Sequence, residues 1–180
     1  MSDVRARLLE LFKTRAVSFG EFTLASGQKS SYYINSKKVL FHSEAAWLLG
    51  EMLWQATQDL SITAVGGLEV GAIPMAAVTV TRYHDHGGTL EGFFVRKQAK
   101  GHGSQALIEG DLKPGDRVAV LDDVLTTGES ALKAVKAVEA VGAVVARVVS
   151  IVDRLQGAHE TLAGYDFRPL FTIRDLGIKG

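Results

Sequence analysis

The apolar positions at the start of the chain predict a helix followed by a hairpin or a meander. Over residues 4–17 they recur at helical spacing with Arg, Glu and Lys between them, so an amphipathic helix is expected. The runs 22–24 and 31–34 are short and rich in β-forming residues, and a turn-prone stretch with a glycine separates them. A second helix is expected from Ser43, which suits the N-cap, to about Asp59.

From residue 62 onward, segments with strand and helix patterns alternate. Apolar strands such as 118–121 show no polar alternation, which is typical of strands buried on both faces. Their alternation with helices predicts an α/β fold with a parallel sheet covered on each side. Because no repeat or linker interrupts the pattern, residues 1–180 are expected to form one domain, with 1–40 as a small hood over the site. The expected strands are 62–65, 92–95, 117–121, 144–152 and 167–173, and the expected helices are 71–83 and 128–141.

Composition and charge narrow the range of partners. The 180 residues are 47% hydrophobic and 22% charged, as in ordinary globular proteins. Lys and Arg number 20 and Asp and Glu number 20, so no net field attracts nucleic acid or an acidic membrane, and neither is expected as a partner. The lack of cysteine excludes a thiolate zinc site and a cysteine nucleophile. No signal core and no apolar run of ~20 residues occur, so a cytoplasmic protein is expected.

The strongest chemical motif follows the strand 117–121, at the edge of the sheet where α/β proteins bind ligands. Two acids are followed there by hydroxyl side chains and Gly128, at the start of a helix. Unpaired N–H groups and the helix dipole favour an anion at such a turn, and the glycine allows close approach, so a phosphate site is expected. The segment consists of Asp122, Asp123, Val124, Leu125, Thr126, Thr127, Gly128, Glu129 and Ser130.

The paired acids, Asp122 and Asp123, suit the vicinal hydroxyls of a ribose, and their charge favours a cation that develops on the sugar. The alternative is that they only cap the helix and that the turn is solvated. The segment is not a Walker A loop, because no Gly-Lys-Ser or Gly-Lys-Thr occurs, and it lacks the Rossmann glycine pattern.

A second motif places Arg96, Lys97, Lys100 and His102 within seven residues that contain no acid. In a neutral protein this is a local anion trap, and its glycines allow the loop to close over a polyphosphate with Lys100 and His102 against the leaving group. The alternative is a solvated basic loop, because surface Lys and Arg are common.

Residues 122–130 resemble the phosphoribosyl-diphosphate motif of the type I phosphoribosyltransferases, and 96–103 resembles the catalytic loop of their orotate-specific branch. Further matches cover nearly the whole chain in the right order: 22–27 with 31–35, 66–74 and 151–154. The resemblance implies the fold of the type I phosphoribosyltransferases. It also implies that orotate and 5-phosphoribosyl 1-diphosphate are the substrates, in pyrimidine (UMP) synthesis. It also implies a homodimer whose loop 96–110 reaches the neighbour's site, and Mg²⁺ held mainly by the substrate diphosphate rather than by the protein.

The resemblance also assigns roles to residues. Tyr33 and Ile34 would line the pyrimidine, Arg154 would grip the orotate carboxylate, and Thr126 would serve both ligands. Taken alone, Tyr32 and Tyr33 suit packing, and Arg154 suits a ligand contact and a plain ion pair about equally. Lys100, Asp122 and Asp123 would be the catalytic residues. The diphosphate substrate would bind Arg96, Lys97, Lys100, His102 and residues 122–130. Ala25 and Gly71 stand where the enteric type carries lysines, the second of which approaches the diphosphate, so neither receives a role.

By this resemblance, orotate N1 displaces diphosphate from C1 of the ribose through an oxocarbenium-like transition state, giving orotidine 5'-monophosphate. No protein nucleophile is needed.

Three alternative functions are considered for these motifs. A transferase for a purine or another pyrimidine would share 122–130 but not 96–103. A non-catalytic sensor that binds RNA or DNA would need a basic surface, which the neutral composition disfavours. In a receiver domain the paired acids follow the first strand, whereas here they follow a late one.

Overall fold

The structure is a computed structural model that describes residues 2–23, 29–98 and 107–178. The chain begins with helix α1 (Ser2–Leu11) and a π-helical turn, η1 (Phe12–Ala16), which together occupy the predicted first helix. An antiparallel hairpin of β1 (Val17–Thr23) and β2 (Lys29–Ile34) follows, as expected. Together with the short helix α2 (Lys37–Leu40), these elements form the hood.

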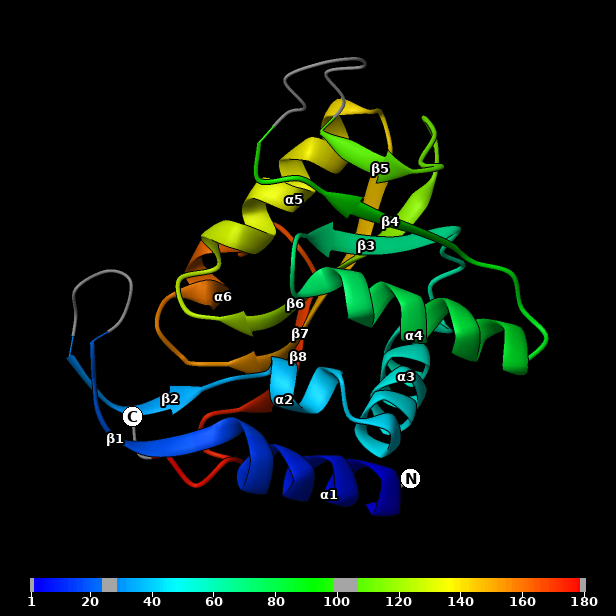
Figure 1. Ribbon diagram of the computed structural model, residues 1–180. Helices are drawn as coiled ribbons and strands as arrows, with labels where there is room; N and C mark the ends of the chain where they lie inside the picture. The colour runs from blue at the N-terminus through cyan, green and yellow to red at the C-terminus, as the bar shows by residue number, and fades with distance from the viewer. Residues whose placement is uncertain (1, 24–28, 99–106, 179–180) are drawn as a thin grey trace.

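Six strands form the main sheet, in the order β5-β4-β3-β6-β7-β8 (Figure 1). All neighbouring pairs are parallel except β4 and β5, which are antiparallel, so the predicted mostly parallel sheet is confirmed. The strands are β3 (Ala64–Leu68), β4 (Glu91–Val95), β5 (Ile108–Gly110), β6 (Arg117–Leu125), β7 (Val144–Asp153) and β8 (Phe167–Thr172).

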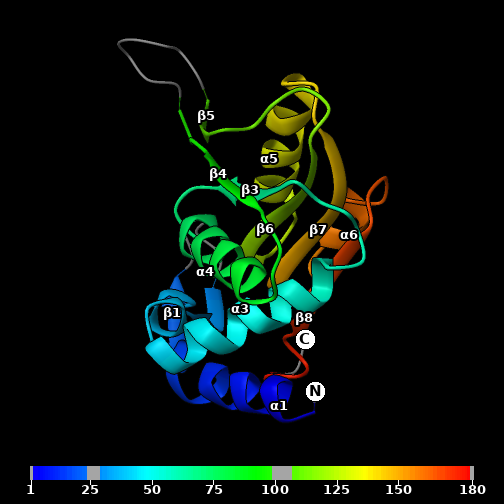
Figure 2. The same ribbon diagram turned by 90° about the vertical axis from the view of Figure 1, so that its right-hand side faces the viewer.

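Helices cover both faces of the sheet, as Figure 2 shows for α4 and α5. On β6, Ala119 and Leu121 pack with residues of α1, α3 and α4, whereas Val118 and Val120 pack with α5 and α6. In the part of the chain that is described, no helix is both long and apolar enough for a membrane crossing. The remaining helices are α2 (Lys37–Leu40), α3 (Ser43–Thr57), α4 (Ala72–Asp85), α5 (Glu129–Ala140) and α6 (Ala158–Thr161).

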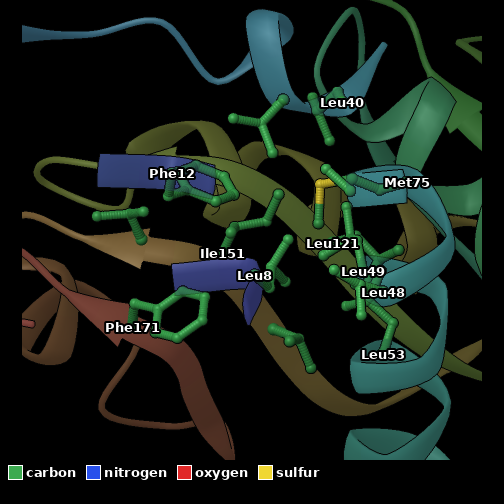
Figure 3. Close-up of a cluster of buried hydrophobic side chains, with 14 of the residues drawn as sticks. Leu8, Phe12, Leu40, Leu48, Leu49, Leu53, Met75, Leu121, Ile151 and Phe171 are labelled. Carbon is green, nitrogen blue, oxygen red and sulfur yellow. The ribbon is translucent and has the colours of Figure 1, made fainter. Parts of the chain in front are cut away.

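The hood shares its hydrophobic core with the sheet. Leu8 and Phe12 are fully buried in the cluster that also contains Leu121, Ile151 and Phe171 (Figure 3). Burying a side chain of this size contributes roughly 1.5–3 kcal/mol. The hood is therefore held firmly against the carboxyl ends of the strands.

Two predicted details were wrong. The N-cap of α3 is His42, whose Nδ1 accepts a hydrogen bond from the Ala45 N–H at 3.4 Å, and Ser43 is the first helical residue. Strand β6 runs on to Leu125, so Asp122 and Asp123 lie within the strand and not after it. Two acids can lie at the end of this strand because each carboxylate accepts a side-chain hydrogen bond, Asp122 from Ser130 and Asp123 from Ser36.

Candidate active site

Asp122 and Asp123 are consecutive residues near the end of β6, and their carboxyl groups lie within hydrogen-bonding reach of each other while contacting different neighbouring elements. Asp122 is only 8% exposed. Its Oδ2 accepts a hydrogen bond from Ser130 Oγ at 2.6 Å, and its Oδ1 accepts one from the Asp123 N–H at 2.8 Å. Asp123 points toward the hood, where its Oδ2 accepts a hydrogen bond from Ser36 Oγ and pairs with Lys37 Nζ at 3.0 Å.

These environments separate the acidities of the two groups. Burial raises the pKa of Asp122 to about 7, and the nearby charge of Asp123 acts in the same direction. Burial also opposes ionisation of Asp123, but hydrogen bonding from Ser36 and the charge of Lys37 outweigh it and hold its pKa below the usual value. Asp123 is therefore the ionised member of the pair at neutral pH.

The turn after β6 has the geometry of an anion site. Gly128 is the N-cap of α5 with φ +85°, a left-handed conformation that favours glycine. The N–H groups of Thr126, Thr127 and Gly128 donate to no acceptor among the described residues. Three unpaired donors beside the positive end of a 12-residue helix favour a phosphate group.

Several of the residues predicted to bind the phosphate have side chains with other surroundings in this structure. The Ser130 hydroxyl donates to Asp122, so it stabilises the carboxylate pair instead of facing the turn. The Leu125 side chain is fully buried in the core and Val124 packs against it, which leaves only their backbones for a ligand. Glu129 is exposed on the first turn of α5. The close approach at Gly128 is to the backbone of α6, where a Cβ would lie 3.2 Å from Ala158 Cα.

The base of the basic loop lies at the same edge of the sheet. The Lys97 N–H donates to Glu69 Oε1 at 2.8 Å, and Lys133 Nζ of α5 donates to the Lys97 carbonyl at 2.7 Å. Arg96 Nε lies 3.7 Å from Glu109 Oε1, across the two ends of the loop. Arg96 and Lys97 are thus brought between the loop after β3 and the first turns of α5. Lys100 and His102 lie outside the described residues.

The loop between β3 and α4 borders the paired acids. Gly71 packs against the Asp123 carboxylate so closely that a Cβ at position 71 would overlap it. A lysine at this position, as in the enteric type, would therefore require Asp123 to move.

Arg154 follows β7 and lies beside the same turn. Its N–H donates to the Leu125 carbonyl at 2.9 Å, which places it next to Thr126, a partly buried residue. Its Nε donates to the Tyr32 hydroxyl at 3.1 Å, and its Cζ lies 4.9 Å from the Tyr32 ring centroid. Arg154 is therefore held by a tyrosine and not by the acidic partner that a plain ion pair would need.

The two residues predicted to line the pyrimidine do not share a face of β2. Tyr33 is 45% exposed and its ring contacts Phe22, whereas Ile34 packs toward the core on the same side as Tyr32. Sequence reasoning missed Tyr32, although the two-residue period of a strand places it with Ile34. It also missed Ser36 and Lys37, for which the sequence carries no local signal.

Arg154 also lines a cavity of about 680 Å³ together with Tyr32. The cavity lies between the hood, the segment after β7 and the segment after β8. A cavity of this size admits a small planar anion. Its lining consists of Tyr32, Arg154, Leu155, Gln156, Ile173, Arg174, Gly177 and Ile178.

Comparisons with known proteins agree on one family. Residues 36–169 match the model of the phosphoribosyl transferase domain. The orotate phosphoribosyltransferase of Corynebacterium glutamicum is 43% identical over 180 residues, which cover 99% of this chain and 96% of that protein. A crystal structure of the Mycobacterium tuberculosis orotate phosphoribosyltransferase with Fe(III) dicitrate superposes with a TM-score of 0.86 and 41% identity over 97% of this chain and 99% of that one. Another, with 5-phospho-alpha-D-ribosyl 1-diphosphate, gives a TM-score of 0.82 and 37% identity over the same shares.

Proposed function

Because the chain belongs to the phosphoribosyltransferase family, among its orotate phosphoribosyltransferases, we propose that it transfers the 5-phosphoribosyl group from 5-phosphoribosyl 1-diphosphate to N1 of orotate. The products are orotidine 5'-monophosphate and diphosphate, in the synthesis of UMP. The observation that carries this proposal is the convergence of the turn 126–130, the paired acids and Arg154 at the ends of two neighbouring strands, with Lys97 beside them.

Each part of the site has a role in the proposed reaction. The N–H groups of 126–128 hold the 5'-phosphate, which fixes the ribose over β6. The ionised carboxylate of Asp123 accepts hydrogen bonds from the ribose hydroxyls and stabilises the positive charge that develops at C1. Asp122, with its raised pKa, adds less negative charge, so the two acids need not repel each other in the folded state.

The acceptor side of the site is built around Arg154. Its guanidinium offers a planar fork of donors that matches a carboxylate, and Tyr32 fixes its orientation while leaving Nη1 and Nη2 for the ligand. Orotate carries a carboxylate that uracil lacks. This arrangement therefore favours orotate over uracil and over purines.

We propose Mg²⁺ as the cofactor, carried by the substrate diphosphate. The described residues include no cluster of three or more Asp, Glu or His side chains suited to a metal ion, and an ion that takes its ligands from phosphate oxygens and water needs none. When bound, the ion neutralises part of the charge on the leaving diphosphate. Arg96 and Lys97, with Lys100 and His102 farther along the loop, contribute the remaining positive charge.

We also propose a homodimer in which loop 96–110 reaches the partner's site. An apolar groove of about 330 Å³ lies beside β5, where this loop returns to the sheet. We propose that a second copy of the chain packs into this groove. The groove is lined by Ile73, Ala76, Ala77, Val80, Gly92, Phe93, Phe94, Glu109 and Gly110.

We also propose a cytosolic location, which accords with a chain without cysteine.

The function is tested by the loss of orotate absorbance with 5-phosphoribosyl 1-diphosphate and Mg²⁺, run in parallel with uracil and hypoxanthine. We expect turnover with orotate alone. Turnover with hypoxanthine or uracil and not with orotate would favour another transferase of the family, and tight binding of the diphosphate substrate without turnover of any base would favour a sensor.

A further inference from the structure

Lys37 is a charged residue of the hood that lies at the carboxylate pair. It begins the short helix α2, and its Nζ is 3.0 Å from Asp123 Oδ2. The preceding residue, Ser36, is buried and donates to the same oxygen. Two donors from the hood thus occupy one oxygen of the carboxylate that the proposed mechanism assigns to the ribose.

The position of Lys37 relative to the loop after β3 gives it a second possible partner. Gly71 packs directly against the Asp123 carboxylate, so this carboxylate contacts both the Lys37 ammonium and the loop. The side chain of Lys37 is 51% exposed, and its ammonium has three N–H donors, of which one is directed at Asp123. Within residues 2–23, 29–98 and 107–178 its other donors have no acceptor, so they are available to a ligand.

The pair between Lys37 and Asp123 is well suited to exchange. The lysine side chain is 51% exposed and flexible, whereas the Asp123 side chain is only 14% exposed, so the lysine can turn to a ligand while the carboxylate keeps its bond from Ser36. Ser36 is buried and rigidly placed by comparison, and it keeps Asp123 oriented when the lysine moves.

Resting on the proposed function, we propose that Lys37 binds the diphosphate of 5-phosphoribosyl 1-diphosphate and supplies the cation that Gly71 does not. In the free enzyme Lys37 pairs with Asp123. When the substrate binds, the ribose hydroxyls take the Asp123 oxygen and the lysine turns to the diphosphate. The hood thereby contributes to binding of the phosphoribosyl donor as well as of the base.

The test compares Lys37→Met, which keeps the length of the side chain and removes its charge, with Lys37→Arg. Lys38→Met is the matched control, because Lys38 is the next residue of α2 and is exposed. Calorimetry with magnesium diphosphate measures binding without turnover. We expect Lys37→Met to weaken this binding roughly tenfold or more, Lys37→Arg to restore most of it, and Lys38→Met to match the wild type.

Ribose 5-phosphate separates a contact with the diphosphate from an indirect effect through Asp123. It carries the hydroxyls and the 5'-phosphate but no diphosphate, so its affinity in Lys37→Met should equal that of the wild type or exceed it, because the lysine no longer competes for Asp123. Equal weakening of both ligands, or unchanged binding of magnesium diphosphate in a folded Lys37→Met variant, would overturn the proposal. Failure of the wild type to turn over orotate would refute the proposed function and leave the diphosphate measurement valid.

Discussion

At the scale of single residues, the site depends on the different surroundings of two neighbouring acids. Asp122 is directed into the interface with α5, where burial favours its neutral form, and Asp123 is directed toward donors from the hood. The motif itself was evident from the sequence. The different environments of the two acids were not, because Ser36 and Lys37 are more than 80 residues away from Asp123 along the chain.

The raised pKa of Asp122 makes stability depend on pH. The folded state retains the Asp122 proton up to about pH 7, whereas an ordinary Asp loses it near 3.8. The stability gained from this proton is thus fully present below about pH 4 and is lost as the pH rises to about 7. An asparagine at position 122 would not titrate, and its side-chain amide could donate a hydrogen bond to Ser130 Oγ.

We therefore expect Asp122→Asn to gain stability relative to the wild type as the pH rises from 4 to 7, by about 1 to 4 kcal/mol. Urea unfolding of both proteins over this pH range measures the difference. A difference that stays constant with pH would show that Asp122 is not held in its neutral form.

Arg154 is the residue on which recognition of the acceptor depends. We expect Arg154→Ala to raise the orotate KM tenfold or more and to leave the KM for the phosphoribosyl donor nearly unchanged, because only the carboxylate contact is lost. Tyr32→Phe keeps the ring beneath the guanidinium and removes its hydroxyl partner, so a smaller rise is expected. Arg168→Ala, on the surface of β8, is the control. An orotate KM that does not change in Arg154→Ala would cancel the carboxylate role.

At the scale of elements, the turn from β6 to α5 joins the phosphate site to the core. The long elements were predictable, since their apolar patterns extend over many residues. The short elements α2, α6 and β5 were not, because three or four residues carry no usable period. Two of the residues that matter at the site, Ser36 and Lys37, lie at the start of such an element.

Gly128 is the residue of this turn most sensitive to substitution. Its φ of +85° strains any other residue, and α6 leaves a Cβ little room. We expect Gly128→Ala to lower the unfolding free energy by about 1–3 kcal/mol. Gly164→Ala, at a position with open space around it, should change it by about 0.5 kcal/mol or less. Equal effects of the two substitutions in thermal or urea unfolding would contradict this account of the turn.

At the scale of the whole molecule, the hood, the sheet and the basic loop act on one substrate pair. The hood is part of the main core through Leu8 and Phe12, and its second strand and α2 bring Tyr32 and Lys37 to the site. The sequence predicted a hood, but an appendage packed on its own would not hold these side chains in place. The shared core became apparent only in the fold.

The proposed dimer predicts complementation between inactive subunits. Lys100→Ala should lower turnover by ~10² to 10³ and Asp123→Asn should also be inactive, each with folding intact. If loop 96–110 serves the neighbouring site, a mixed dimer contains one site with both wild-type residues. Activity should therefore return after subunit exchange. No recovery, despite exchange demonstrated by differently tagged subunits, would place the loop over its own site.

The central claim is that one phosphoribosyl donor spans the turn 126–130, the acids of β6 and the base of the basic loop. A crystal structure with 5-phosphoribosyl 1-diphosphate and Mg²⁺ tests it most directly. We expect the 5'-phosphate on the N–H groups of 126–128, the ribose hydroxyls on Asp122 and Asp123, and the diphosphate between residue 71 and Lys97. A 5'-phosphate bound away from this turn, or a ribose that contacts neither acid, would contradict the account.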